Sequence, residues 1–220
     1  MTEPDRGQQT RELIVDTALR LFRERGYDET TMRAVAKEAG VSVGNAYYYY
    51  ASKENLVQEF YLRLQVEHEA AAQPVLERET DFGARLRGVL HAWLDVAGAY
   101  HAFAAQFFKI AAEPTSPLSP FSAESSPSRD AAIALMAQVV EGSTARADPE
   151  LRADLPDLLW LMTLGIVLYW VHDRSPEQAN TRLLIDRAVP LVDRLVGLSR
   201  LRIMRSVTRD VIALARLLRG

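Results

Sequence analysis

The stretch MRAVAKEAGVSVGNAYYYYA, residues 32–51, carries the pattern that decides the fold. Val35 and Ala36 fall on one face of a predicted helix, and Gly40 follows where that helix ends. Two helices that cross steeply through a short turn need a small residue at the crossing and a turn residue that tolerates left-handed backbone angles. Ala36 and Gly40 meet these two requirements, and Ser42 can cap a second helix at once. The spacing therefore predicts a helix-turn-helix.

Four consecutive tyrosines, residues 47–50, fall on two faces of this second helix. At helical spacing from Ser42, the side chains of Ala46, Tyr49 and Tyr50 point toward the preceding helices. The others point outward, at the end of the helix that would lie nearest the bases if it entered a major groove. The second helix is therefore a candidate recognition helix with one buried and one DNA-facing side.

The outward residues have the chemistry that such a contact requires. Gly44 allows the backbone to approach closely, Asn45 can donate to and accept from a base edge, and Val43 can contact a thymine methyl group. Tyrosine hydroxyls can bind phosphates, and so can Lys53 with the free amides of the helix that Ser52 caps. The predicted DNA-contacting residues are Thr31, Arg33, Ser42, Val43, Gly44, Asn45, Tyr47, Tyr48, Tyr49 and Lys53.

Bulk charge gives no support to a nucleic-acid ligand. The formal net charge of the 220 residues is −3, and the first sixty residues carry ten acidic against eight basic side chains. A nucleic-acid-binding domain is usually marked by a basic surface. The DNA-binding hypothesis therefore depends on geometry, and the alternative that the helix-turn-helix is only a structural pair of helices stays open.

The wider stretch RELIVDTALRLFRERGYDETTMRAVAKEAGVSVGNAYYYYASKENLVQEFY, residues 11–61, resembles the N-terminal DNA-binding domain of TetR-family transcriptional regulators. The matching pieces include Gly26-Tyr27, Thr30-Thr31, the Ala39-Gly40-Val41-Ser42 turn, Tyr47 and the Ser52-Lys53-Glu54-Asn55-Leu56 run. The resemblance covers about a quarter of the chain. It implies a homodimer and an all-α C-terminal domain that binds a small effector, with effector binding lowering the affinity for operator DNA.

Three positions depart from the family pattern. Members usually carry leucine or isoleucine at the position of Ala46, phenylalanine at that of Tyr50, and often a polar residue or proline at that of Val43. Alanine in place of leucine would lose about 2–3 kcal/mol of packing if nothing filled the space. We expect the pair Tyr49 and Tyr50 to fill it.

Helical patterns extend from end to end, so the predicted fold is all-α, with an N-terminal three-helix domain and a larger helical domain. The predicted division is 1–55 for DNA binding and 56–220 for ligand binding and dimerisation. Thr10 is the expected N-cap of the first helix, and Pro74 is expected to bend or end the helix that follows Ser52. The other predictions are helices over 81–97, 100–112, 129–144, 149–172, 176–196 and 198–218, with a Pro/Ser-rich and mobile loop over 114–128. The last helix combines an apolar stripe with an arginine-rich face and could pack on the larger domain, a membrane surface or DNA.

Aromatic and amphipathic residues concentrate in the middle of the chain and suggest a pocket for an apolar effector. The candidate lining residues are His91, Trp93, Tyr100, His101, Phe103, Phe107, Met136, Trp160 and Tyr169. For each of them, burial in an ordinary core is the competing explanation.

Two apolar helices in succession, over 149–172 and 176–196, indicate a helical dimer interface. The candidate contact residues are Leu158, Leu161, Gly165, Leu168, Leu184, Leu191 and Leu195. Burial within one chain is the alternative for this face.

No pattern for catalysis, a metal or a cofactor occurs. The chain has no cysteine, no HExxH spacing, no glycine-rich phosphate loop and no nucleophile elbow. The N-terminus lacks a signal-peptide pattern, and the apolar run over 158–171 is too short to span a bilayer, so we expect a cytoplasmic protein without a membrane partner. The sequence favours a homodimeric repressor that binds a palindromic double-stranded operator and is released by a small hydrophobic effector. The alternative is a helical small-molecule-binding protein or enzyme with a purely structural helix-turn-helix.

Overall fold

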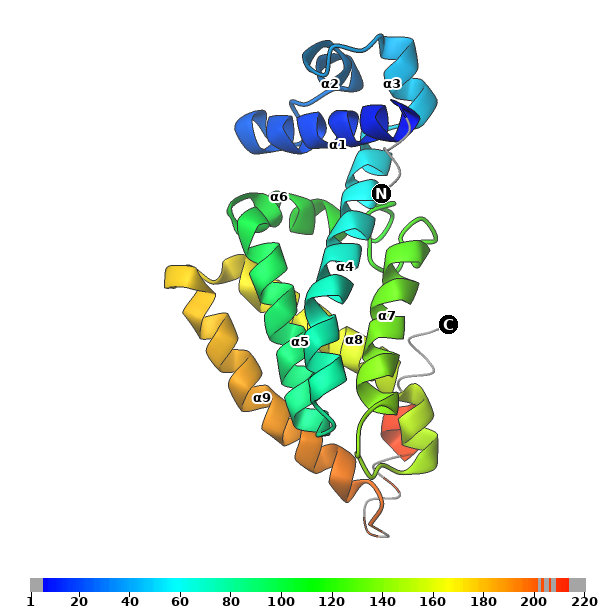
Figure 1. Cartoon of the computed structure of the whole chain (residues 1–220), viewed down its shortest axis with the longest axis vertical. Helices are drawn as coiled ribbons and strands as arrows, with labels where there is room; N and C mark the ends of the chain where they lie inside the picture. Colours follow the sequence, from blue (N-terminus) through cyan, green and yellow to red (C-terminus); the bar gives the residue numbers. More distant parts are fainter. Residues whose placement is uncertain (1–5, 202, 204–205, 207–208, 214–220) are drawn as a thin grey trace. The chain divides into compact units, whose positions relative to one another are not determined.

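A computed structural model describes residues 6–201, 203, 206 and 209–213 of the chain, whose described part contains helices and no strand (Figure 1). The all-α prediction is therefore confirmed. The helices are α1 (Arg6–Arg25), α2 (Met32–Glu38), α3 (Val43–Tyr49), α4 (Lys53–Arg78), α5 (Phe82–Ala97), α6 (His101–Ala111), α7 (Ser126–Glu141), α8 (Pro149–His172) and α9 (Ala179–Leu198). Two short 3-10 helices, η1 (Gly98–Tyr100) and η2 (Pro176–Gln178), precede α6 and α9.

The chain divides into two compact units. Unit 1 consists of Met1–Leu64 with Tyr100–Ser128, and unit 2 of Gln65–Ala99 with Arg129–Gly220. Unit 1 thus combines the N-terminal helices with α6 and the segment that follows it. The sequence predicts a division by function between residues 55 and 56, whereas these two units are divided by compactness. The functional division therefore stays a prediction.

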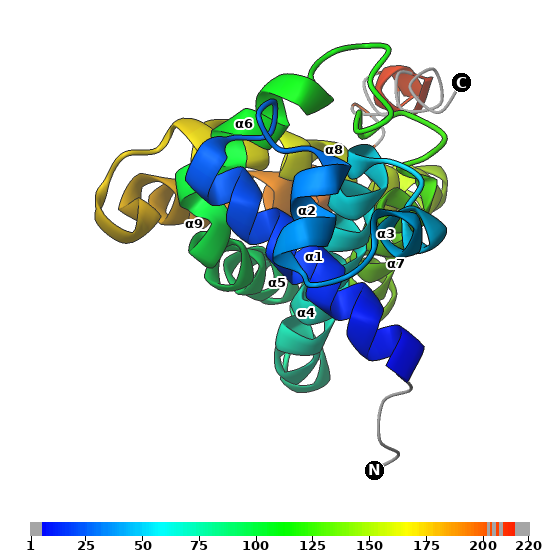
Figure 2. The ribbon, with the colours of Figure 1, turned by 90° about the horizontal axis from the view of Figure 1, so that it is seen from above.

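The helix-turn-helix of unit 1 forms at the predicted residues. Thr31 caps α2, with its hydroxyl accepting a hydrogen bond from the Ala34 amide at 3.2 Å. Gly40 has a φ of +68°, which is unfavourable for any residue with a Cβ, so glycine allows the sharp turn. Ser42 then caps α3 by accepting a hydrogen bond from the Asn45 amide at 3.0 Å. Figure 2 shows α2 crossing α1.

The core of unit 1 buries one face of each N-terminal helix. Phe22 of α1, Ala36 of α2 and Ala46 of α3 are fully buried in a single hydrophobic cluster. Tyr50 is 4% exposed in the same cluster, and Tyr49 packs against it. The tyrosine pair thus belongs to the cluster that contains Ala46, although Tyr50 lies beyond the end of α3 and has an extended backbone.

The Pro/Ser-rich segment between α6 and α7 is anchored in unit 1. Leu118 is completely buried in the unit 1 cluster. The Gln58 side-chain amide donates hydrogen bonds to the Pro117 carbonyl oxygen at 2.6 Å and to the Ser125 hydroxyl at 3.0 Å. The expectation of a mobile loop up to residue 128 needs correction, because these contacts hold the segment and α7 already begins at Ser126.

Unit 2 is a helical assembly in which α9 runs alongside α5 and contacts α8 (Figure 1). Arg85 of α5 is 5% exposed and donates to carbonyl oxygens from two chain segments. Its guanidinium binds the carbonyls of Leu76 and Glu79 near the end of α4, and those of Gln138 and Val139 in α7. A buried cation thereby binds carbonyl oxygens at the C-terminal ends of α4 and α7, where helix carbonyls run short of amide partners.

Helix α8 is the one described helix that is long and apolar enough to span a membrane by length and composition. The apolar run over 158–171 is short, but the helix containing it has 24 residues, so length alone does not exclude a span. Core helices of soluble proteins meet the same criterion, and α8 buries Leu155, Leu159 and Trp160 within unit 2.

Several predicted helix boundaries were wrong. Thr10 lies inside α1, where its hydroxyl donates to the Arg6 carbonyl, and it is therefore not an N-cap. Helix α4 continues through Pro74 to Arg78, so Pro74 does not end it, and α9 begins at Ala179 after η2. The helix predicted over 198–218 lies partly outside the described residues.

Candidate nucleic-acid interface

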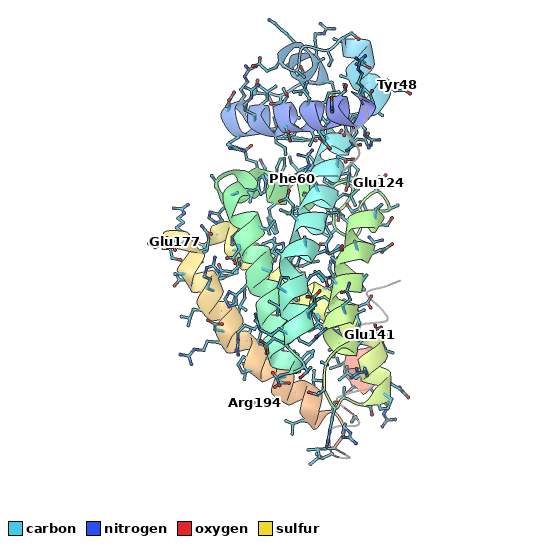
Figure 3. The ribbon with its side chains drawn as sticks, in the orientation of Figure 1. Tyr48, Phe60, Glu124, Glu141, Glu177 and Arg194 are labelled. Atoms are coloured by element: carbon cyan, nitrogen blue, oxygen red, sulfur yellow. The ribbon has the colours of Figure 1, made fainter. Side chains whose placement is uncertain are left out.

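Helix α3 has one buried and one exposed side. Ala46 is fully buried, whereas the side chains of Val43, Tyr47 and Tyr48 are 40%, 51% and 81% exposed. Figure 3 shows Tyr48 on α3, at the surface of unit 1. Of the predicted outward residues, Val43, Gly44, Tyr47 and Tyr48 are therefore exposed on one short helix, and Asn45 is half-buried beside them.

The polar atoms on this side are available to a ligand. The Asn45 side-chain amide and the Tyr47 and Tyr48 hydroxyls make no hydrogen bond to another described residue. The rings of Tyr48 and Tyr49 pack edge to face, with centroids 5.2 Å apart. This contact restrains the two rings and leaves the Tyr48 hydroxyl exposed.

The side chain of Lys53 is held beside Tyr27. Its ammonium group lies 4.0 Å from the centre of the Tyr27 ring and donates to the Tyr27 carbonyl oxygen at 3.0 Å. The Tyr27 hydroxyl donates to Glu54 at 2.6 Å, and burial together with this bond raises the pKa of Tyr27. Because an ammonium group has three N–H donors, Lys53 can keep this carbonyl contact and still bind a phosphate.

Charge on this surface comes from α2 and α4, since α3 carries no charged side chain. Thr31 and Arg33 are exposed at the start of α2. Arg33 forms no ion pair with another described residue. Arg33 and Lys53 are the two basic residues among the predicted DNA-contacting residues.

The candidate pocket residues are distributed over both units. Tyr100, His101 and Phe107 belong to unit 1, and His91, Trp93, Met136, Trp160 and Tyr169 to unit 2. The side chain of Phe103 is outside the described part.

In unit 1, Phe107 is a core residue, 4% exposed and packed against the rings of Phe22, Tyr27 and Phe60 at 5.7, 6.2 and 6.0 Å. The Tyr100 ring lies 4.8 Å from that of Phe60, which Figure 3 marks on α4. Core packing thus accounts for both of these aromatic side chains, while their assignment to a pocket stays a prediction.

In unit 2, the candidates have different environments. His91 Nε2 lies 3.0 Å from a carboxylate oxygen of Asp186, and the rings of Trp93 and Trp170 are 5.0 Å apart. Met136 is 2% exposed, whereas Tyr169 is 45% exposed. A pocket lined by these residues stays a prediction.

The candidate dimer residues include a set of exposed leucines. Leu168 of α8 is 46% exposed, and Leu191 and Leu195 of α9 are each 59% exposed. Gly165 is also exposed, while Leu158, Leu161 and Leu184 are half-buried. Leu183 and Leu198 of α9, which were not predicted, add 52% and 44% exposed side chains.

Some contacts that shape unit 1 had no clear signal in the sequence. The carbonyl oxygen of the Gln106 side chain, on α6, accepts a hydrogen bond from the Tyr27 amide at 3.3 Å. Leu118 enters the core from a segment whose composition predicts a loop. The position of Leu118, a single leucine between two Ser-Pro pairs, was the one sequence feature that could indicate its burial. No sequence feature indicated the hydrogen bond between Gln106 and Tyr27.

Two segments of the chain match known families. Residues 14–60 match the bacterial regulatory proteins of the tetR family. Residues 85–214, more than half of the chain, match the tetracyclin repressor-like C-terminal domain. The chain is 47% identical over 45 residues to the uncharacterized HTH-type transcriptional regulator YuxN of Bacillus subtilis, a segment that is 20% of this chain and 16% of that protein. The chain matches its curated relatives over less than half of their own length.

The fold is similar to that of solved regulators. The TetR transcriptional regulator from Nitrosomonas europaea aligns with a TM-score of 0.64 and 17% identity, over 83% of this chain and 97% of that chain. Thermus thermophilus FadR, a TetR family transcriptional repressor in complex with lauroyl-CoA, aligns with a TM-score of 0.57 and 23% identity, over 81% and 92%. With a DNA-binding family matched at one end and the partner C-terminal family over most of the rest, the chain belongs to the TetR family of transcriptional regulators.

Proposed function

We propose that the chain binds a palindromic double-stranded operator as a homodimer and represses transcription until a small hydrophobic effector releases it. Residues 1–55 bind DNA, and residues 56–220 bind the effector and the second copy. The protein acts in the cytoplasm, without a membrane partner. The family consists of transcriptional regulators and not of enzymes.

The observation that carries this proposal is the exposed side of α3. A helix capped by Ser42 and supported by buried Ala46 presents an amide and two tyrosine hydroxyls that the described residues leave unbound. A structural helix pair has no need for an 81% exposed Tyr48 on such a surface. Major-groove recognition uses the first residues of such a helix for base edges and the flanking polar groups for phosphates.

The exposed leucines of α8 and α9 support a homodimer. A folded domain rarely leaves several neighbouring large apolar side chains exposed, and such faces usually mark an interface. Helical regulators bind two half-sites about one DNA turn apart, so a dimer with twofold symmetry predicts a palindromic operator.

The repressor and effector parts of the proposal are supported by relatives. Thermus thermophilus FadR is a repressor whose solved structure contains lauroyl-CoA, a ligand with a long apolar chain. In this chain, the partly buried Trp93 and buried Met136 of unit 2 are the kind of side chains that line a pocket for such a ligand.

Selection from a pool of random duplex DNA tests the proposal. The purified full-length chain should enrich a palindrome, with an affinity that falls as salt rises, because phosphate contacts release counterions. A folded dimer that enriches no sequence at low salt would refute DNA recognition by the unliganded protein. Hydrophobic ligands that lower operator affinity would support release of the protein from its operator by an effector. Ligands that raise operator affinity would refute this part of the proposal.

A further inference from the structure

The recognition surface of α3 is uncharged, and this limits which bases it can read. Between Val43 and Tyr49 there is no lysine, arginine, aspartate or glutamate. A bidentate arginine or lysine is the commonest specific contact to guanine, and an acidic side chain is the one that accepts from cytosine. The helix therefore lacks the side chains that most strongly select G·C pairs.

The first turn of α3 presents side chains that suit A·T pairs. Asn45 has an unbound amide, which can donate to N7 and accept from the N6 amino group of adenine. Val43 is 40% exposed, and its branched methyl groups can pack on the thymine methyl group. Ser42 is less available, because its hydroxyl oxygen already accepts the Asn45 amide hydrogen.

The backbone of α3 can come close to the base pairs. A Cβ built on Gly44 would meet no other atom within 4 Å, so the helix surface at this position is open. A close approach is needed for short side chains such as valine and asparagine to reach the groove floor. The geometry thus matches the reach of the two proposed contacts.

We propose that α3 selects A·T pairs, with Val43 contacting a thymine methyl group and Asn45 an adenine edge in each half-site. This inference rests on the proposed DNA-binding function and specifies the class of sequence that the same surface recognises. Any guanine preference of the operator then arises outside the α3 contacts, and exposed Arg33 of α2 has the side chain that such a contact uses.

Modified bases test the two contacts on the operator selected by the full-length chain. Replacing the contacted thymine by uracil removes only the methyl group and should weaken binding about fourfold per half-site. Replacing the contacted adenine by 7-deazaadenine removes one acceptor and should weaken binding about fivefold. In Val43→Ala the uracil effect should disappear, and in Asn45→Ala the deazaadenine effect should disappear. Arg33→Ala is the control, and it should retain both effects.

Repeating the selection with Val43→Ala and Asn45→Ala identifies the base pairs that α3 contacts. Positions that lose their preference in these variants should be A·T in the wild-type operator. If those positions are G·C, or if uracil and deazaadenine bind as well as the natural bases, the inference is wrong although the DNA-binding function stands. If the wild-type chain enriches no sequence, the proposed function itself fails, so the two failures are distinguishable.

Discussion

The exposed side of α3 depends on a few individual residues. Gly40 permits the turn, Ser42 caps the helix, and Ala46 packs closely against the core. Their combined effect is to fix the rotation of a seven-residue helix, so that Val43 and Tyr48 face solvent. A helix this short is not stable by itself, and its orientation is therefore a tertiary property.

Gly44 is expected to lower the stability of the fold while allowing α3 to approach DNA closely. Replacing Gly44 by alanine should stabilise the fold by about 0.5–1 kcal/mol, because glycine costs conformational entropy inside a helix and the added Cβ meets no atom. The same Cβ should hinder the approach to DNA and weaken operator binding about tenfold. Chemical denaturation and fluorescence anisotropy measure the two effects, and equal or tighter DNA binding by the variant would contradict the close-approach role.

Asp173 stabilises the turn between α8 and α9. Its carboxylate accepts hydrogen bonds from the amides and hydroxyls of Ser175 and Thr181 at 2.6–2.9 Å. Burial alone would raise the pKa of Asp173, but these hydrogen bonds outweigh it and lower the pKa to about 2. The turn also contains Glu177 and Gln178 with positive φ, which is costly for residues other than glycine.

This lowered pKa predicts a pH-dependent stability difference between the wild type and Asp173→Asn. Above about pH 4 the ionised carboxylate should make the wild type more stable by about 2 kcal/mol, because the folded state binds the proton more weakly than the unfolded chain. The difference should shrink as the pH falls from about 4 to 2. Urea unfolding followed by tryptophan fluorescence measures it, since all three tryptophans lie in unit 2. A difference that stays constant over this range would contradict the assignment.

For individual residues, the sequence predicted caps and turn conformations best where they depend on neighbours close in sequence. The cap at Ser42 and the left-handed Gly40 follow from short-range chemistry and were predicted correctly. Thr10 was predicted wrongly, because a threonine inside a helix can bind the carbonyl four residues earlier in place of capping. The Tyr27 contacts with Lys53 and Gln106 join residues far apart in sequence, and no local rule predicts them.

Among the elements, the segment between α6 and α7 contributes most unexpectedly to unit 1. Phe107 from α6 and Leu118 from the segment complete the same hydrophobic cluster that supports α1, α2 and α3. The bonds from Gln58 to Pro117 and Ser125 fasten the segment to α4. The DNA-facing unit is therefore built from two stretches of chain that are distant in sequence.

Leu118→Ala should destabilise unit 1 by about 3 kcal/mol, because it leaves a cavity in a fully buried site. Hydrogen exchange at the amides of α2 and α3 measures the local loss of protection. Phe121→Ala is the matched control in the same segment, since Phe121 is 58% exposed and its loss should change stability by less than about 0.5 kcal/mol. Equal protection in both variants would show that the segment does not support unit 1.

Helix existence was more predictable than helix boundaries or partners. Helix α8 has the predicted bounds because Asp148 caps it and Pro149 starts it. The start of α7 was missed by three residues, since the two serines and one proline in its first turn resemble a loop in composition. Which helix packs on which could not be predicted, because α5, α8 and α9 all offer apolar side chains and no local rule pairs them.

For the whole molecule, the exposed leucines of α8 and α9 should hold two copies together. Leu195→Asp should convert the dimer to a folded monomer at micromolar concentration, because a charged side chain would be buried without a partner in the interface. Sedimentation equilibrium measures the mass. Leu13→Asp is the control, as Leu13 is 48% exposed on α1 of unit 1 and should leave the dimer intact. A Leu195→Asp variant that remains dimeric would place the interface elsewhere.

The most direct test of DNA recognition by α3 compares wild type with Tyr48→Ala on the selected operator and on a scrambled duplex. Tyr48 is 81% exposed, so its removal should change the free energy of unfolding by less than about 0.5 kcal/mol. Operator affinity should nevertheless fall about tenfold or more, and affinity for the scrambled duplex should fall with it, because a hydroxyl that binds a phosphate contributes to both complexes. Unchanged operator affinity, or an affinity lost only together with folding, would mean that the exposed side of α3 does not bind DNA.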